Sequence, residues 1–417
     1  MDKKRLIYMA IFIVVCILLG YAIYRVFFAR KALLEIGTIT PGESGEFPIS
    51  GEGKIPGQLV IPPSQLPSPG TVPITTSPTQ PGAGQPVLVI PPGTLSKALI
   101  TQTTQASTLG AAPAKNSGAR FYNMQDGKFY RIKPDGTIEL LRDQIFYNVQ
   151  NVTWSPKNNE SIIEYPDGAN IYYNFDTGEQ VSLPKHWEDF SFSAEGSQIA
   201  SKSIGLDPGN RWLITSDPKG TQVKLIEPMG ENASKVTVDW SPNRQVVALS
   251  ATGDPLNGSR QQILLVGLNH ENFKSITVEG YGLESQWSKS GEKLLHSVYS
   301  PTSNYKPELW IVGATPDNAG QNRKPLGVNT WASKCTMSDD RFAYCGVPNT
   351  LDDGSGFAPQ IADGTPDELY KIDTVTGIKT KIQLDDIYTI ASMFTSTDGK
   401  TLYFTDKNKN GIFEMPI

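Results

Sequence analysis

From about residue 118 onward, short runs of alternating apolar and polar residues are separated by tight turn signals. Three segments share one pattern, in which a strand-like run is followed by an Asp/Gly turn and a second run: Phe129–Leu140, Ile171–Leu183 and Leu369–Ile382. Alternation with a period of two residues, bounded by DG or TG turns, is typical of antiparallel strands joined as hairpins. The pattern therefore predicts an all-β domain.

A longer repeat groups these hairpins. Six segments place a serine after an apolar or small residue, and a polar turn and a strand follow it: Ser155, Ser193, Ser241, Ser288, Ser338 and Ser396. Their successive spacings are 38, 48, 47, 50 and 58 residues. A repeat of about 40–50 residues is the size of one β-propeller blade, in which four strands A to D follow one another. The serine turn would then lie between strands A and B.

The repeat has recognisable motifs. A WSP turn, as in VTWSPKNNESIIEY, followed by a segment such as IYYNFDTGEQVSL, resembles the repeats of the TolB-like, WD40-like (PD40) propeller family. The resemblance covers about 300 residues, and it weakens where Met337 and Thr395 replace the aromatic residue of the motif and where the turn at 338–341 is shortened. It implies a propeller fold but no single activity, because such propellers serve many roles.

The predicted fold is a β-propeller of four-stranded antiparallel blades, with seven blades favoured over six. Phe121–Leu141 aligns with Ile163–Leu183 and supplies strands B, C and D of a first blade that lacks strand A. The C-terminus supplies strands A, B and C of a last blade. Counting the first partial unit with the six serine-bearing units gives seven, whereas merging the two partial blades gives six.

The N-terminus has a different pattern. Leu6–Tyr24 contains no charged residue. At about 1.5 Å per residue this run nearly spans a bilayer core of about 30 Å, and the helix can continue to Phe28 if Arg25 snorkels. We expect a transmembrane helix over residues 6–28 after a cytoplasmic tail of residues 1–5. A cleaved signal peptide would have a shorter apolar core, and basic residues on both sides leave the orientation undecided.

Residues 29–117 read as a disordered stalk, in which Pro, Gly, Thr, Ser and Gln dominate from residue 37. Such a composition forms no packed core, and proline keeps the chain extended. Because an extended linker holds a domain away from a membrane, we place the propeller, residues 118–417, outside the cytoplasm. A fragment that begins at Gly118 is then expected to fold alone. Two similar blocks, LVIPPSQL at Leu59–Leu66 and LVIPPGTL at Leu88–Leu95, are either docking sequences or a duplication within the linker.

Composition and motifs argue against several classes of function. The net charge of -5 does not suit a nucleic-acid-binding face, and three cysteines and three histidines are too few for a Cys/His metal framework. His186, His270 and His296 belong to different blades and are expected at the surface or in the packing. No G-x-S-x-G elbow, P-loop or dinucleotide fingerprint occurs, and no room is left after the last strand for a peptidase domain. We therefore assign no catalytic or cofactor-binding residue.

Aromatic residues and inserts are the other features of the repeat. Trp154, Trp240 and Trp287 occupy the same repeat position and are expected to pack between adjacent blades. Four inserts are expected to project from the rims: Gly205–Arg211, Gly253–Arg260, Tyr299–Pro307 and Pro348–Pro366. The longest insert, here taken as Asn349–Asp367, contributes four carboxylates, Asp352, Asp353, Asp363 and Asp367. It is either a partner site or a solvated loop.

The segment SKCTMSDDRFAYCGV predicts two strands around a tight turn near Asp340, which places Cys335 opposite Cys345. Cross-strand Cβ atoms lie about 4.5–5.5 Å apart, a distance that must tighten somewhat to form a disulfide. A compartment outside the cytoplasm permits the bond. We predict a disulfide between these cysteines, and the alternative is a pair of buried thiols.

A calcium loop is predicted in DKNKNGIFE, the segment Asp406–Glu414. Its oxygen ligands would come from the side chains of Asp406, Asn408, Asn410 and Glu414 and from the carbonyl of Ile412. The spacing resembles the D-x-D-x-D-G-x-x-D loops between strands of some propellers, such as integrin heads. Asn replaces Asp twice, however, and Lys407 and Lys409 add repulsive charge. The alternative is a polar B–C hairpin that turns at Asn410 and Gly411.

These features predict a non-enzymatic cell-envelope protein that presents an extracytoplasmic propeller for protein–protein contact. A propeller enzyme of the lactonase or glycan-cleaving kind would need clustered acids, histidines or a metal on the inner strands, and no repeat-phased cluster is seen. A ligand sensor that relays through the helix would need an output domain, which the short tail cannot hold. The sequence does not identify the partner or the face that binds it.

Overall fold

The computed structural model describes residues 98–271 and 273–417, all within the compact unit Gln80–Ile417. The transmembrane segment expected at 6–28, both LVIPP blocks and most of the expected stalk lie outside these residues. Among the described residues, no helix is long and apolar enough to cross a membrane.

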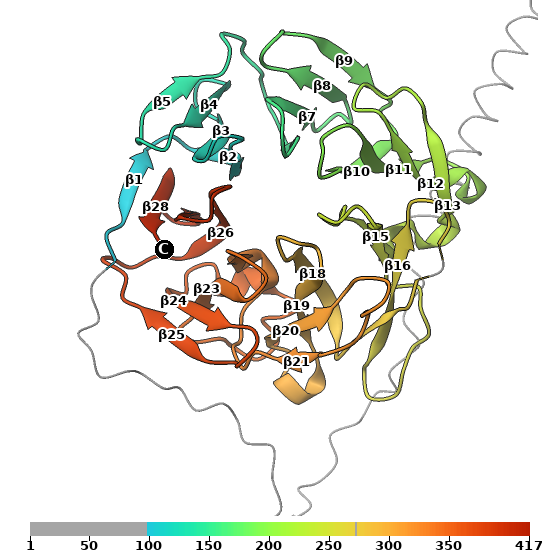
Figure 1. Ribbon diagram of the computed structural model, residues 1–417, viewed down its shortest axis with the longest axis vertical. Coiled ribbons are helices and arrows are strands. Elements are labelled where there is room, and N and C mark those ends of the chain that lie inside the picture. Colours follow the sequence, from blue (N-terminus) through green and yellow to red (C-terminus); the bar gives the residue numbers. More distant parts are fainter. Residues whose placement is uncertain (1–97, 272) are drawn as a thin grey trace, which may run out of the picture. The chain divides into compact units, whose positions relative to one another are not determined.

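Seven four-stranded antiparallel sheets are arranged as a ring, and Figure 1 shows strand A nearest the centre in the four blades where this strand is labelled, β2, β10, β18 and β26. Blades 1 to 3 are β2–β5 (Thr108–Pro113, Ala119–Asn123, Lys128–Ile132, Ile138–Leu140), β6–β9 (Asn151–Trp154, Glu160–Glu164, Asn170–Asn174, Gln180–Leu183) and β10–β13 (Trp187–Phe192, Ile199–Ile204, Arg211–Ser216, Lys224–Pro228). Blades 4 to 6 are β14–β17 (Val236–Val238, Val246–Ser250, Gln261–Gly267, Ile276–Val278), β18–β21 (Tyr281–Trp287, Lys293–Tyr299, Pro307–Gly313, Lys324–Pro325) and β22–β25 (Cys335–Met337, Phe342–Pro348, Asp367–Asp373, Lys379–Ile382). The predicted all-β propeller and its favoured count of seven blades are confirmed.

Blade 7 joins the two ends of the described chain. Its inner strands are β26, β27 and β28 (Ile390–Thr395, Thr401–Asp406, Ile412–Pro416), and its outermost strand is β1 (Thr101–Thr104), which pairs antiparallel with β28 (Figure 1). Strand β2 supplies the strand A that the first blade was predicted to lack. The predicted boundary at Gly118 is therefore wrong, because two strands of the propeller precede it. Their sequences, TQTT and TLGAAP, contain Thr, Gln, Gly and Pro, which are among the residues that dominate the expected stalk.

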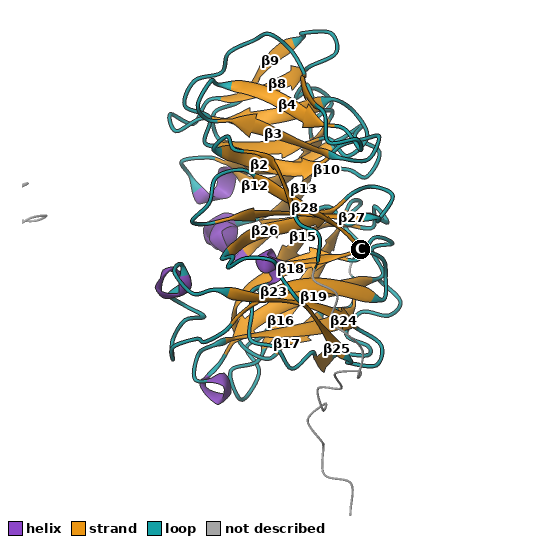
Figure 2. Cartoon of the chain, turned by 90° about the vertical axis from the view of Figure 1, so that its left-hand side faces the viewer, coloured by secondary structure: helices purple, strands orange, loops and turns teal. Residues whose placement is uncertain are grey.

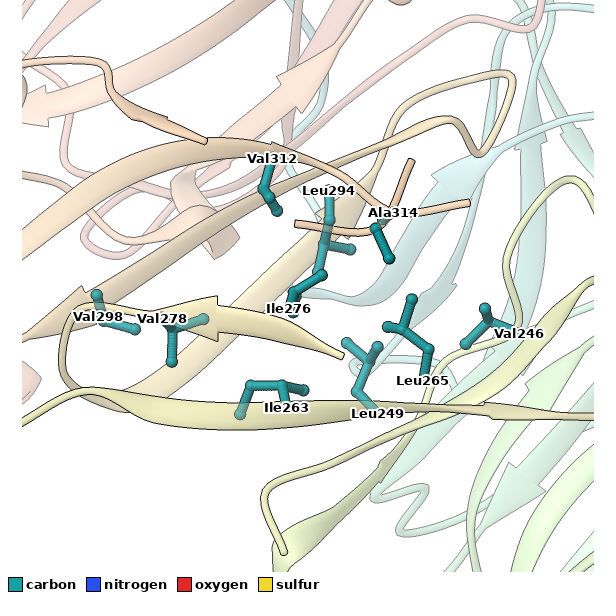
Figure 3. Packing of buried hydrophobic residues seen from close by; sticks show 11 residues of the cluster. Val246, Leu249, Ile263, Leu265, Ile276, Val278, Leu294, Val298, Val312 and Ala314 are labelled. Carbon is teal, nitrogen blue, oxygen red and sulfur yellow. The ribbon is translucent and has the colours of Figure 1, made fainter. Parts of the chain in front are cut away.

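The hydrophobic core lies in layers between neighbouring blades. Figure 3 shows the layer between blades 4 and 5, where β15–β17, β19, β20 and the residue after β20 contribute Val246, Leu249, Ile263, Leu265, Ile276, Val278, Leu294, Val298, Val312 and Ala314. Trp287 packs against this layer, and the Trp154 indole Nε1 donates a 2.7 Å hydrogen bond to the carbonyl of Gly110 in the preceding blade. Trp154 and Trp240 are buried. The predicted packing of these tryptophans between blades is confirmed.

The repeated serine has a local role in the turn between strands A and B. The hydroxyl Oγ of Ser241 accepts a hydrogen bond from the backbone N–H of Val246 at 2.9 Å. Ser288 accepts one from Lys293 at 3.2 Å, in the same way. A short polar side chain that bridges its own turn in this manner fixes the hairpin. Ser193 and Ser396 accept the corresponding bonds, so the bridge accounts for the serine in four of the six serine turns.

The two faces of the ring differ because the strands of each blade alternate in direction. The A–B and C–D connections lie on one side, here called the turn face, and the B–C and D–A connections lie on the other, the loop face. All five short 3-10 helices of the described residues are in loop-face connections: η1–η5 (Pro208–Asn210, Gly230–Lys235, Pro301–Ser303, Ala332–Lys334, Pro359–Ala362). Figure 2 shows them on one side of the ring.

Candidate functional site

The four predicted inserts all belong to the loop face, because each joins strand B to strand C of its blade. They occupy 205–210 in blade 3, 251–260 in blade 4, 300–306 in blade 5 and 349–366 in blade 6. The last is the longest B–C connection of the described chain and contains η5. Loops carry binding residues more often than the elements they connect. The loop face is therefore the candidate side for binding.

The exposed large hydrophobic side chains that belong to connections lie mainly on this face. Among the described residues, the loop-face connections expose Met124, Ile145, Tyr147, Leu206, Tyr305, Phe357, Ile361 and Ile387. The turn-face connections expose Val223, Val375 and Ile378. Contiguous exposed apolar surface on a soluble domain marks interaction sites. The distribution therefore distinguishes the loop face as the better candidate for contact with a partner.

Four aromatic residues on the loop face pack against one another, and we call them the aromatic ridge: Tyr281, Tyr299, Tyr305 and Phe357. Ring centroids are 6.4 Å apart for Tyr281 and Tyr299, and 6.0 Å apart for Tyr299 and Phe357. The rings of Tyr305 and Phe357 are 5.9 Å apart. Tyr281, Tyr305 and Phe357 remain 40%, 41% and 61% exposed. Residues distant in sequence thus form one exposed aromatic surface.

The 349–366 insert is fastened to blade 5 at the ridge. The backbone N–H of Gly354 donates to the carbonyl of Asn304 at 2.9 Å, and that of Gly356 donates to Tyr305 at 2.7 Å. These bonds join the B–C connection of blade 6 to that of blade 5. Phe357 is held next to Tyr305 because the two loops share this backbone contact.

The other end of the insert is fastened to blade 7. Lys407 forms an ion pair with Asp363, and the Thr389 hydroxyl donates to the carbonyl of Thr365 at 3.3 Å. The insert therefore bridges two neighbouring blades. Asp363, which the sequence placed in a candidate partner site, is engaged within the protein.

Lys334 and Asp367 form a buried ion pair where the insert ends. The Lys334 Nζ lies 2.7 Å from Asp367 Oδ2, and the two side chains are 6% and 0% exposed. The backbone N–H of Ile390 in blade 7 donates to the same oxygen at 2.6 Å. Burial raises the pKa of Asp367 and lowers that of Lys334, and in each group the partner's charge opposes the effect. Asp367 is therefore a structural residue and not an exposed ligand for a partner.

A polar cavity of about 600 Å³ lies between blades 2 and 3, and its walls include Asn151, Glu164, Glu188, Asp189 and Lys202. Lys202 Nζ lies 2.7 Å from Asp189 Oδ2, and Asn151 Nδ2 donates to Glu164 Oε2 at 2.6 Å. Burial raises the pKa of Glu164, and the charges of Asp189 and Glu188 raise it further. The sequence showed no such cluster because these carboxylates occupy different positions of the repeat, two of them next to an irregularity in the pairing of β10.

Two more titratable groups lie in the adjacent blades. Burial raises the pKa of Asp239, next to β14, to about 7, an effect that the Trp287 indole partly offsets. His296 in β19 is fully buried, and burial lowers its pKa to about 4. Asp239 therefore changes charge near neutral pH, whereas His296 is neutral there. His186 and His270 are exposed, and no three His, Cys, Asp or Glu side chains of the described residues are grouped to hold a metal.

The segment predicted to bind calcium is the hairpin between β27 and β28. The Asp406 Oδ1 accepts hydrogen bonds from the backbone N–H groups of Asn408 and Lys409 at 2.7 and 2.8 Å. Its Oδ2 accepts one from the backbone N–H of Thr389 at 2.5 Å. A carboxylate that caps its own turn in this way is typical of an Asx turn.

Two backbone carbonyls of the hairpin, one of them the predicted ligand from Ile412, are engaged by side chains of β1. The carbonyl of Asn410 accepts from Gln102 Nε2 at 2.9 Å, and that of Ile412 accepts from the Thr103 hydroxyl at 2.9 Å. Glu414 lies in β28 opposite Tyr403. These contacts agree with the hairpin alternative, and calcium binding stays a prediction.

Titration of calcium into a fragment of residues 98–417 tests this site. If the loop binds calcium, the ion stabilises the folded state by linkage and raises the melting temperature. The rise is expected to be small, because two carboxylates give weak affinity, and to disappear in Asp406→Ala. A parent without a calcium-dependent shift, or an equal shift in the variant, would leave only the hairpin.

The strands β22 and β23 place Cys335 directly opposite Cys345, which confirms the predicted register. The Cα atoms are 4.1 Å apart, and the two sulfurs are bonded in the structure. Both residues are fully buried. The bond links strands A and B of blade 6, the blade that carries the longest insert.

Alkylation followed by intact-mass measurement tests this disulfide in the purified protein. Residues 98–417 contain no other cysteine, so the denatured, unreduced fragment is expected to gain no alkyl group. After reduction it should gain two. Two alkylated thiols without reductant would refute the bond.

The ring can be compared with solved structures. The β-propeller domain of Myceliophteria thermophila Cps50 (Swd1) aligns with a TM-score of 0.50 at 9% identity, covering 76% of this chain and 100% of that one. A prolyl endopeptidase aligns with a TM-score of 0.50 at 10% identity, covering 76% of this chain and 51% of that one. No family model and no curated protein matches the chain. At such identities the likeness supports the propeller fold and no particular activity.

Proposed function

We propose that this chain is a non-enzymatic, membrane-anchored protein of the cell envelope whose propeller binds other proteins through the loop face. The observation that carries the proposal is the concentration of exposed hydrophobic side chains on that face, including the aromatic ridge. Exposed aromatic residues held by packed neighbours are frequent anchors of protein interfaces. A face built only to be solvated would show no such concentration.

Anchoring and orientation rest on the sequence. The charge-free run at Leu6–Tyr24 is long enough for a membrane helix, and the proline-rich segment after it suits a spacer. The disulfide between Cys335 and Cys345 suits an oxidising compartment.

Cysteine labelling tests the orientation. In Ser77→Cys with Cys16→Ser, the new thiol is expected to react with a membrane-impermeant maleimide in intact cells, after any outer layer is permeabilised. A matched variant, Lys3→Cys with Cys16→Ser, places the thiol on the expected cytoplasmic tail and should react only after lysis. Labelling of the Ser77→Cys variant only after lysis of the inner membrane would contradict the proposed orientation.

Chemical cross-linking of membranes tests the binding function. A variant with Tyr147, Leu206 and Ile387 changed to serine is expected to lose the cross-linked proteins that the parent retains. The matched control changes Val223, Val375 and Ile378 to serine on the turn face. If only the turn-face variant lost its cross-linked proteins, binding would belong to the turn face and the proposal would be wrong.

The cavity between blades 2 and 3 favours one alternative, a propeller enzyme that acts on a lactone or a glycan near the axis. Its half-buried Glu164, next to Asp189 and Glu188, is the kind of carboxyl that a general acid uses. Turnover of a panel of lactones and oligosaccharides that is abolished in Glu164→Gln would establish this alternative. Turnover that persists in the variant would argue against it.

A further inference from the structure

The aromatic ridge is rigid before any partner arrives. A Cβ atom at Gly282 would lie 2.3 Å from Tyr299 Cε1, and one at Gly356 would lie 2.4 Å from Tyr299 Cβ. Glycine at both positions therefore lets the backbone close around this ring. Rings fixed in this way lose little conformational entropy on binding, which favours affinity.

The backbone at the ridge is also held in an uncommon conformation. Asn304 and Tyr305 have φ angles of 54° and 56°, in the left-handed region. A large aromatic residue rarely adopts this region without a compensating contact. Here the compensating contact is the hydrogen bond that Gly356 donates to the Tyr305 carbonyl. The strained position turns the Tyr305 side chain toward Phe357, and both rings remain partly exposed.

Carboxylates precede the ridge in the same loop. The backbone N–H of Ser355 donates to the carbonyl of Asp352 at 3.2 Å, and Asp353 Oδ1 lies 3.2 Å from Lys306 Nζ. Asp352 is exposed, and within the described residues its carboxylate has no ion pair or hydrogen bond. A free negative charge therefore lies within a few residues of Phe357, so the surface combines exposed rings with an unpaired carboxylate.

We propose that the ridge binds an extended segment of a partner protein through an arginine. This inference rests on the proposed function and names the chemistry of its partner. A guanidinium can stack on an exposed ring of Tyr305 or Phe357 while its N–H groups pair with Asp352. Arginine suits this surface better than lysine, because only its planar group can stack and pair with a carboxylate in two places.

The ring orientations favour a peptide over a sugar. Tyr299 and Tyr305 are inclined by 56°, and Tyr305 and Phe357 by 76°. Rings at such angles present edges and separated faces, into which side chains fit one by one. A sugar stacks best on a single flat platform, which these rings do not form.

Fluorescence anisotropy with the full-length protein in detergent micelles tests the proposal. The probe is a fluorescein-labelled peptide with arginines between prolines, and matched peptides carry citrulline or glutamate in place of arginine. We expect the arginine peptide to bind about tenfold more tightly than the citrulline peptide, since the two differ in charge but little in shape. Equal binding of the three peptides, or no binding of the arginine peptide, would overturn the proposal.

Variants locate the binding on the ridge. Phe357→Ala and Asp352→Asn are each expected to weaken binding of the arginine peptide about tenfold. Val223→Ala on the turn face and Asp254→Asn in the B–C connection of blade 4 should leave its binding unchanged. Thermal melts of both ridge variants should match the parent, because the altered side chains are exposed.

Binding that survives in both ridge variants would also overturn the proposal. So would selective binding of a labelled chitin oligosaccharide that Phe357→Ala abolishes, since the ridge would then be a glycan site. The proposed function would still stand after either result if the loop-face serine variant loses its cross-linked proteins. Failure of the arginine proposal can therefore be distinguished from failure of the proposed function.

Discussion

A fragment that begins at Gly118 is expected to lose the cooperative unfolding transition that a fragment of residues 98–417 shows. The shorter fragment lacks β1 and β2, and with them the pairing of β28 and the inner strand of blade 1. It also lacks the Gly110 carbonyl that accepts from the Trp154 indole. Without β1, the chain no longer ties the first blade to the last, and a propeller left open exposes the core layers on both sides of the gap. Circular dichroism melts and size-exclusion chromatography measure the difference.

A third fragment separates the two strands. Residues 106–417 retain β2 and lack only β1, so this fragment is expected to melt cooperatively but at a lower temperature than 98–417. The order of stability should be 98–417, then 106–417, then 118–417, with the last aggregating. If the fragment from Gly118 melts as cooperatively and at the same temperature as the longest one, the strand closure described here is wrong.

Breaking the buried ion pair between Lys334 and Asp367 is expected to cause a large loss in the free energy of unfolding of the propeller. In Lys334→Met, Asp367 remains buried with its charge unpaired, and in Asp367→Asn the charge of Lys334 is left unpaired. Removing one partner of a buried pair costs about 3–5 kcal/mol of the free energy of unfolding. Chemical denaturation of the 98–417 variants measures this change. The loss is large, because the whole free energy of unfolding of a native protein is only about 5–15 kcal/mol.

The double variant Lys334→Met with Asp367→Leu provides the control. It removes both charges, so it should be clearly more stable than either single variant even though Asp367 no longer accepts from Ile390. The coupling between the two sites is the difference between the double change and the sum of the single ones. Single variants as stable as the parent would mean that the pair is not buried in solution.

The fold could be predicted largely because its repeat has a physical cause. Serines that bridge A–B turns and tryptophans that pack between blades recur because the blades share one strand arrangement and pack against their neighbours in the same way. Strands β1 and β2 could not be found in this way. Their residues are small or polar and only partly buried, and Gly110 in β2 has a φ of 60°, so the alternation that identifies a strand is absent.

The candidate site was only partly visible in the sequence. The inserts were found from their length, and their common face follows from their shared place between strands B and C. The ridge was missed because Tyr299 and Phe357 come from different blades and meet through loop contacts that no local pattern encodes. The left-handed conformation of Tyr305 is also unexpected for an aromatic residue. Asp363 and Asp367 were likewise expected in an insert that was either a partner site or a solvated loop, whereas both carboxylates are paired inside the protein.

Site-specific photo-crosslinking in intact cells tests the central claim most directly. A photoreactive amino acid is placed in turn at Leu206 and Ile387 on the loop face and at Val223 and Val375 on the turn face, all exposed positions. We predict adducts with another protein from the two loop-face positions and none from the turn face. Adducts from the turn face alone, or equally from both faces, would contradict the account.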